Sequence, residues 1–184
     1  MKTVIKSSPE LTPSTTAPGS SVVQIRIETA NESDVSVTLE LVRELAAHEN
    51  LLNSMTATED SLRDALFSAQ PSAEVLLARH GIETIGMAIF FMTFSSMRGR
   101  RCLYLDDLYV KEKWRGKGIG RQLLTRVTEV AAARNCARVE WVVHNWNHPA
   151  IRLYESCGAT LLREWTRCRM EEHAIQSLSG TCGY

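Results

Sequence analysis

A glycine-rich basic turn carries the clearest sign of chemistry in this sequence of 184 residues. The turn reads Lys-Trp-Arg-Gly-Lys-Gly-Ile-Gly and ends at Gly120. Residues 103–110 before it alternate apolar and polar side chains as a strand does, and residues 121–134 after it have apolar residues at helical spacing. Because the first N–H groups of a helix have no intrahelical partner and lie at the positive end of its dipole, a phosphate or pyrophosphate can bind across such a turn.

Glycines at positions 116, 118 and 120 let the backbone adopt positive φ and approach a ligand closely. Added positive charge comes from Arg115, Lys117 and Arg121. A P-loop is excluded because no Gly-x-x-x-x-Gly-Lys-Ser/Thr run exists, and the dinucleotide fingerprint fails at its third glycine spacing. An ordinary helix entry with solvated basic residues remains the alternative.

Two adjacent carboxylates, Asp106 and Asp107, occupy the strand before the turn. On a regular strand, neighbouring side chains point to opposite faces, so only one of the two can face a common site. A β-bulge would change that expectation. The alternative is a pair of strand acids that are solvated or that bind a neighbouring arginine.

Two motifs together resemble the GNAT superfamily of acyl-CoA-dependent N-acyltransferases. Residues 115–120 are similar to its Arg/Gln-x-x-Gly-x-Gly/Ala signature for the CoA pyrophosphate. Residues 147–158 are similar to its Asn-x-x-Ala-x-x-x-Tyr-x-x-x-Gly element. The run Leu-Tyr-Leu-Asp-Asp-Leu-Tyr-Val at 103–110 and the pair Trp146-Asn147 most resemble the diamine (spermidine/spermine, thialysine) acetyltransferase group.

The resemblance implies an α/β fold, with a mixed, mostly antiparallel sheet whose splayed parallel central strands accommodate the pantetheine arm. It implies acetyl-CoA as acetyl donor, with Tyr154 binding the CoA sulfur and serving as general acid, since a pKa near ~10 keeps its hydroxyl protonated. Main-chain groups of residues 108–110 would hold the pantetheine and the oxyanion. The implied cofactor-binding residues are Leu108, Tyr109, Val110, Arg115, Gly116, Lys117, Gly118, Ile119, Gly120, Arg121, Asn147 and Tyr154.

The resemblance also implies direct acetyl transfer to a primary amine of a small diamine, polyamine or thialysine-like substrate. Asp106 is then the base candidate, acting through water although relatives usually carry a glutamate there, and Asp107 is the amine anchor. Because a polycation needs carboxylates, Glu49 is a further substrate-binding candidate. The basic residues 95–101 weaken the case for spermidine or spermine, and His144-Asn145 departs from the acid usual before Trp-Asn in the diamine group.

Two other functions remain open. One is a protein or peptide N-acetyltransferase with an open groove, and the other is a non-catalytic CoA-binding module, against which the retained Tyr154 argues. The resemblance further implies a homodimer closed through the carboxy-terminal strand.

Composition excludes several other classes of protein. Lys plus Arg and Asp plus Glu both total 21, so no net field favours nucleic acid or membrane. The five cysteines form no C-x-x-C pair and the five histidines show no ligand spacing, so we expect no metal. No apolar run reaches membrane-spanning length, and free thiols suit a reducing compartment, so we expect a soluble cytoplasmic protein.

The chain divides into three parts. Residues 1–21 are rich in Ser, Thr and Pro and predict a flexible leader. Residues 22–171 form the predicted N-acetyltransferase domain, and residues 172–184 a tail with weak helical character. Within the domain, periodicity predicts helices at 35–50, 58–67, 121–134 and 150–156, and strands at 22–28, 73–79, 84–94, 102–110, 138–143 and 164–170.

Overall fold

The computed structural model describes residues 24–180 and contains one five-stranded sheet. The strands follow one another in chain order across the sheet, and all neighbours pair antiparallel except the last two, which are parallel. The predicted mixed, mostly antiparallel α/β sheet is therefore confirmed. Its strands are β1 (Ile25–Thr29), β2 (Glu74–His80), β3 (Glu83–Ser95), β4 (Arg100–Val110) and β5 (Val139–Glu140).

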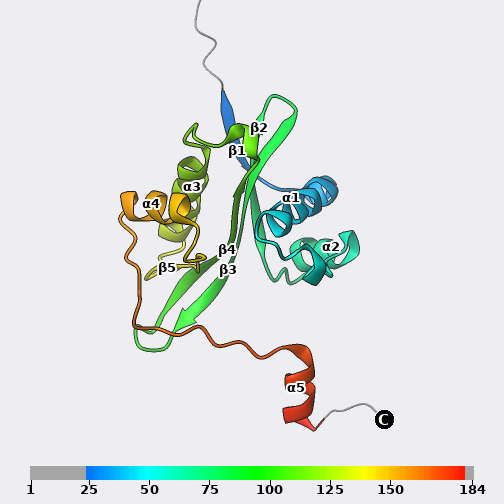
Figure 1. The fold of residues 1–184 in the computed structure, drawn as a ribbon, viewed down its shortest axis with the longest axis vertical. Coiled ribbons are helices and arrows are strands. Elements are labelled where there is room, and N and C mark those ends of the chain that lie inside the picture. The colour runs from blue at the N-terminus through cyan, green and yellow to red at the C-terminus, as the bar shows by residue number, and fades with distance from the viewer. Residues whose placement is uncertain (1–23, 181–184) are drawn as a thin grey trace, which may run out of the picture.

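Helices cover both faces of the sheet (Figure 1). One face carries α1 (Val35–His48) and α2 (Glu59–Phe67), and the other carries α3 (Ile119–Ala133) and α4 (His148–Ser156). Short 3-10 turns lie at Glu32–Asp34, Leu52–Ser54 and Glu112–Trp114, and α5 (Glu172–Ser179) lies apart from the sheet at the end of an extended segment. Among the described helices, none has the length and apolar character needed to cross a bilayer.

Two buried clusters mark the two faces. Leu103 and Leu105 of β4 pack with Leu123 and Val127 of α3, and Tyr109 of β4 packs in the cluster that contains Leu41 of α1 and Leu66 of α2. The helices therefore stay on the sheet because each buries an apolar stripe against it, at roughly 25 cal/mol per Å² of apolar surface removed from water.

Two of the predicted strands differ in the structure. The strand expected at 138–143 is reduced to the two residues of β5, and the strand expected at 164–170 does not form. Residues 162–171 are exposed instead. Their alternating pattern satisfies the local requirement for a strand, but a strand also needs a pairing edge, and none of the described segments supplies one. The leader at 1–21 and residues 22–23 of the first predicted strand lie outside the described residues, as do residues 181–184 of the tail.

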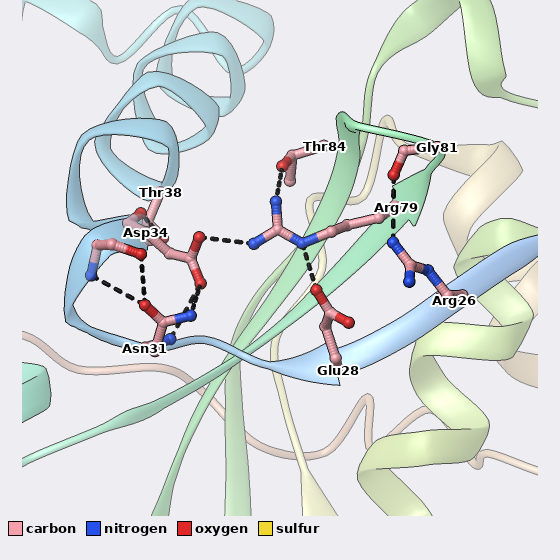
Figure 2. Close-up of polar contacts among 9 residues, drawn as sticks. Arg26, Glu28, Asn31, Asp34, Thr38, Arg79, Gly81 and Thr84 are labelled. Atoms are coloured by element: carbon pink, nitrogen blue, oxygen red, sulfur yellow. Dashed lines mark hydrogen bonds and ion pairs between the residues drawn. The ribbon is translucent and has the colours of Figure 1, made fainter.

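A buried ion pair fixes the start of α1 to the sheet (Figure 2). The Arg79 guanidinium on β2 donates to Asp34 Oδ1 at 2.6 Å, to Glu28 Oε1 at 2.5 Å and to Thr84 Oγ1 at 2.8 Å. The second oxygen of Asp34 accepts from the backbone and side-chain nitrogens of Asn31 at 3.0 and 2.9 Å. The side chains of Asp34 and Arg79 are only 10% and 16% exposed, so solvent screens this pair weakly.

We predict that Asp34→Ala lowers the free energy of unfolding by about 3 kcal/mol, because it leaves the Arg79 charge buried without its principal partner. Urea denaturation of the variant and the parent measures the difference. The control is Asp60→Ala, which removes a carboxylate that is 96% exposed in its ion pair with Arg63 and should cost no more than about 0.5 kcal/mol. Equal losses in the two variants would show that the Asp34 network does not anchor α1.

Candidate active site

An extra residue in β4 turns two side chains toward α1. Ile89 of β3 lies opposite Asp107, while the next residue, Phe90, lies opposite Leu105, so Asp106 is a β-bulge. Before the bulge Leu105 faces α3, whereas after it Leu108 faces α3 and Tyr109 faces α1. The alternation is therefore shifted by one residue, and Asp106 and Asp107 no longer point to opposite faces, as a regular strand would require.

Asp107 lies in surroundings that disfavour a negative charge. Burial, followed by the nearby negative charges of Asp106 and Glu49, raises the pKa of its carboxyl from the ordinary 3.8 to about 7. Asp106, by contrast, is exposed. The Asp107 carboxyl can therefore exchange a proton near neutral pH.

Tyr154 lies on α4 and faces the sheet. Helix α4 begins at a cap made by Asn147, whose side-chain oxygen accepts from the Ala150 N–H at 3.3 Å, and Pro149 occupies its first turn. The Tyr154 ring is buried and packs edge to face on Trp141, with the ring centroids 5.0 Å apart. Burial, followed by the charge of Glu49, raises the pKa of its hydroxyl to about 12. The hydroxyl therefore stays protonated at neutral pH and can act as a proton donor.

The glycine turn has an open helix N-terminus. Gly118 is the N-cap of α3 with φ +78°, Gly116 has φ +73°, and no described side chain caps the helix. A side chain at either glycine would be strained, because L residues rarely adopt such φ values. Gly120 differs from the expectation: it is already helical, and a Cβ there would lie 3.3 Å from Leu153 of α4. Its small size serves the close packing of α3 on α4.

Cationic side chains surround this turn and are held in place by local contacts. The Nε of Arg115 donates to the Val110 carbonyl at 3.0 Å, and its guanidinium lies 5.6 Å from the centre of the Tyr109 ring. Lys117 Nζ lies 4.4 Å from the centre of the Trp114 ring. Arg121 donates to Ser156 Oγ at 2.6 Å and so links α3 to α4. Of the predicted residues here, Ile119 is buried in the core, so only its backbone N–H faces the turn.

The gap beside β4 is where the two parallel strands separate. β5 pairs with β4 only at Leu103 and Tyr104, so residues 105–110 have no described strand partner on that side. The backbone groups of Leu108 and Val110 therefore border this gap. Tyr109 points to the other face, where its hydroxyl donates to Glu44 Oε2 at 3.1 Å.

Sequence reasoning missed the ring cluster at the edge of the site. Glu49 follows α1, and its Oε2 lies 3.6 Å from Nε2 of His144 in the segment after β5. The His144 ring stacks on Trp146 with the ring centroids 5.2 Å apart, and His48 meets Trp146 edge-on at 5.9 Å. The departure from the usual acid at His144 was a signal for this contact, whereas nothing in the sequence singled out His48.

Within residues 24–180, the structure gathers no group of three or more His, Cys, Asp or Glu side chains that could hold a metal ion. The site consists of an open helix N-terminus, an unpaired stretch of β4, a carboxyl that titrates near neutral pH and a protonated phenol. Anion binding combined with proton transfer is the chemistry of an acyltransferase that uses a phosphorylated acyl carrier.

Comparison with known proteins agrees with this class. The model of the Acetyltransferase (GNAT) family matches residues 39–159. The chain is 34% identical over 167 residues to a thialysine N-epsilon-acetyltransferase of Bos taurus, covering 85% of this chain and 98% of that protein. It is 27% identical over 198 residues to an L-ornithine N5-acetyltransferase of Arabidopsis thaliana, covering 83% and 87%. An integron cassette protein from the mobile metagenome of V. cholerae has a similar structure, with a TM-score of 0.68, 28% identity and coverage of 84% and 97%. The protein is a member of the GNAT family of acetyltransferases.

The location of Asp107 predicts an effect on stability. A carboxyl whose pKa is raised on folding favours the folded state only while it is protonated, and this advantage is lost as the pH rises from about 4 to about 7. Asp107→Asn should therefore increase the free energy of unfolding at pH 8 by an amount of order 2 kcal/mol, and should have little effect at pH 4.

Urea denaturation at the two pH values measures this difference. Asp106→Asn is the matched control, because it makes the same change at the exposed neighbour and should alter stability by less than about 0.5 kcal/mol at either pH. A gain for Asp107→Asn that is the same at pH 4 and pH 8 would contradict the account of a buried, titrating carboxyl.

Proposed function

We propose that the protein transfers an acetyl group directly from acetyl-CoA to a primary amine of a small molecule: a diamine, a polyamine or a thialysine-like compound. The observation that carries the proposal is a pair of groups with opposite roles in proton transfer, one suited to accept a proton and one suited to donate a proton. Asp107 has a pKa of about 7 and Tyr154 a pKa of about 12, and both respond to the charge of the same residue, Glu49.

Asp107 has the properties of the proton acceptor. An amine reaches the protein mostly as an ammonium ion and must lose a proton before it can attack a thioester. A carboxyl with a pKa near the working pH accepts that proton efficiently while remaining ionised in a useful fraction of molecules. This reverses the roles implied by the resemblance: we assign the base to Asp107, and Asp106 and Glu49 supply negative charge that attracts the ammonium ion.

Tyr154 has the properties of the proton donor. When the thioester carbon–sulfur bond breaks, the leaving sulfur needs a proton, and the phenol of Tyr154 is protonated at every physiological pH. Its ring is fixed by packing on Trp141, so the hydroxyl is held in one position. Asp107 thus takes up the proton of the ammonium, and Tyr154 gives a different proton to the leaving sulfur. Solvent then removes the proton from Asp107 and reprotonates Tyr154.

The residues of the turn fit the diphosphate of CoA. The free N–H groups at the start of α3 and the positive-φ glycines offer main-chain donors, and Arg115, Lys117 and Arg121 offer charge. The unpaired edge of β4 at Leu108 and Val110 offers donors and acceptors to the pantetheine amides, in the manner of an added strand. Asn147 caps α4, the helix that carries Tyr154. These residues bind and orient the donor so that its reactive end points toward Tyr154.

A small amine suits the site better than a protein substrate. The contact of Glu49 with His144, together with the rings of His48 and Trp146, joins the end of α1 to the segment after β5 across one end of the site. A bridge of this kind restricts a long polypeptide and admits a short amine. The relatives named for thialysine and L-ornithine support the same choice, and a cytoplasmic setting agrees with the four described cysteines, which are all free.

Purified protein with acetyl-CoA and a panel of small amines tests the proposal, with histone-like peptides as the competing substrates. We expect kcat/KM to favour small amines and to rise with pH through a pKa near 7. Asp107→Asn should lower kcat/KM about 10²-fold or more and should abolish its increase with pH. Tyr154→Phe should lower kcat/KM by a similar factor. Asp106→Asn, the matched control, should lose less than about tenfold. Preference for peptides, or an unchanged rate in Tyr154→Phe, would contradict the proposed reaction.

We also propose that two copies form a homodimer through residues 159–171. Within it, residues 164–170 carry the alternating pattern of a strand, and residues 162–171 are exposed, with Trp165 75% and Leu162 54% accessible. The two-residue β5 leaves the sheet with an incomplete edge. A second copy would supply the pairing groups and the apolar cover that the segment lacks in one chain.

Light scattering during size-exclusion chromatography tests the dimer. We expect twice the chain mass of 20.6 kDa, and a shift toward monomer when Trp165→Ser removes the largest exposed apolar side chain of the segment. The control is Met97→Ser, which removes an even more exposed apolar side chain from the β3–β4 connection. A monomer mass for the parent protein would overturn this proposal.

A further inference from the structure

An imidazole and a carboxylate meet at the edge of the site. Glu49 Oε2 and His144 Nε2 are 3.6 Å apart, a separation at which a protonated imidazole and a carboxylate attract but do not form a good hydrogen bond. Both remain accessible to solvent, with side-chain exposures of 27% for Glu49 and 45% for His144. Each therefore keeps hydrogen-bonding capacity for a ligand.

The two side chains are held by different supports. His144 stacks on Trp146 with an interplanar angle of 17°, and the other ring contact of Trp146 is made by His48 at the end of α1. Glu49 is the residue that follows α1, and its backbone N–H bonds to the Leu45 carbonyl at 3.0 Å. The imidazole is thus held by its ring contacts and the backbone of Glu49 by the end of α1, so neither depends on a bond between the two side chains.

Glu49 also connects this charge pair to the reacting groups. Its negative charge contributes to the raised pKa of both Asp107 and Tyr154, so Glu49 lies near both reacting groups as well as against His144. A substrate whose reactive amine lies against Asp107 would extend its other end toward Glu49 and His144.

We propose that Glu49 and His144 together bind the zwitterionic head group of an α-amino acid, whose side-chain amine is the group acetylated. The α-ammonium pairs with Glu49 and the α-carboxylate with His144, while Trp146 supports the imidazole. This inference rests on the proposed function, because it names the class of amine that the same site takes.

A simple diamine fits this end of the site less well. Its distal ammonium satisfies Glu49 but offers no carboxylate to accept a hydrogen bond from the imidazole of His144. The remaining charges near the reactive end, Asp106 and Asp107, are both acidic and act on the reacting amine of either substrate alike. His144 therefore distinguishes an amino acid from a diamine by the α-carboxylate that only the amino acid carries.

Matched substrates isolate that feature. L-lysine and 1,5-diaminopentane differ only by the α-carboxylate, and L-ornithine and 1,4-diaminobutane form a second such pair. Calorimetric titration of each ligand into the full chain with excess CoA gives the ratio of dissociation constants, and acetylation gives the ratio of kcat/KM. We expect the parent to favour the amino acid in both pairs and both readouts, and His144→Gln to reduce that preference about tenfold, the lower range for a charge-assisted bond.

Two further variants separate this role from a general loss of structure. Glu49→Gln should weaken both members of each pair, because both use the carboxylate. His148→Gln changes an exposed histidine at the start of α4 and should leave the preference as it is. A parent that favours the diamine, a His144→Gln variant with the parent's preference, or a failure of every ligand to bind would each overturn the inference. If acetylation favours small amines but shows no dependence on the α-carboxylate, the proposed function stands and this inference fails. If the ligands bind with the expected preference but no acetyl product forms, the head-group site stands and the proposed function fails.

Discussion

The bulge at Asp106 is the constraint on which the rest of the site depends. One additional residue in β4 shifts the alternation of its side chains, so Asp107 and Tyr109 face α1 while Leu108 and Val110 keep an apolar face toward α3. Without it, Asp107 would lie on the same face as Leu105, among the side chains that pack on α3. The bulge thus allows one strand to line the acyl-carrier gap with its backbone and the amine site with its side chains.

Helix α1 positions the opposite wall of the site: its start is anchored to the sheet, and its end carries the residues that border the site. The start of the helix is tied to the sheet by the pair of Asp34 and Arg79, and its end leads directly to His48 and Glu49. A helix is stiff along its length, so an anchor at one end helps fix the residues at the other. The energetic cost of holding Asp107 in surroundings that disfavour its charge is offset by such structural contacts elsewhere, which is typical of functional sites.

Much of this arrangement could be predicted from the sequence because it depends on local patterns. The strand, glycine turn and helix around Gly118 and the helices predicted at 58–67 and 150–156 follow from residue type and spacing, and the structure contains each of them. The resemblance to the GNAT superfamily, drawn from two short motifs, is confirmed by the family match.

The features that sequence reasoning missed depend on contacts between distant segments. The bulge could be named as a possibility but not located, because nothing in the residues around Asp106 distinguishes it from a regular strand. Gly120 looked like a ligand-binding glycine, yet its neighbour is Leu153, 33 positions along the chain. The strand expected at 164–170 has the right alternation and no partner in this chain. The contact of Glu49 with His144 joins residues that only the folded sheet brings together.

A titration of the aspartate and glutamate side-chain carboxyl carbons by carbon-detected NMR tests the central claim most directly, with the Asp107 signal assigned by its absence in the asparagine variant. The account predicts a midpoint near pH 7 for the Asp107 carboxyl. A midpoint for Asp107 near the ordinary value of about 4 would mean that the bulge does not carry this carboxyl into an environment that disfavours its charge, and the assigned base would be wrong.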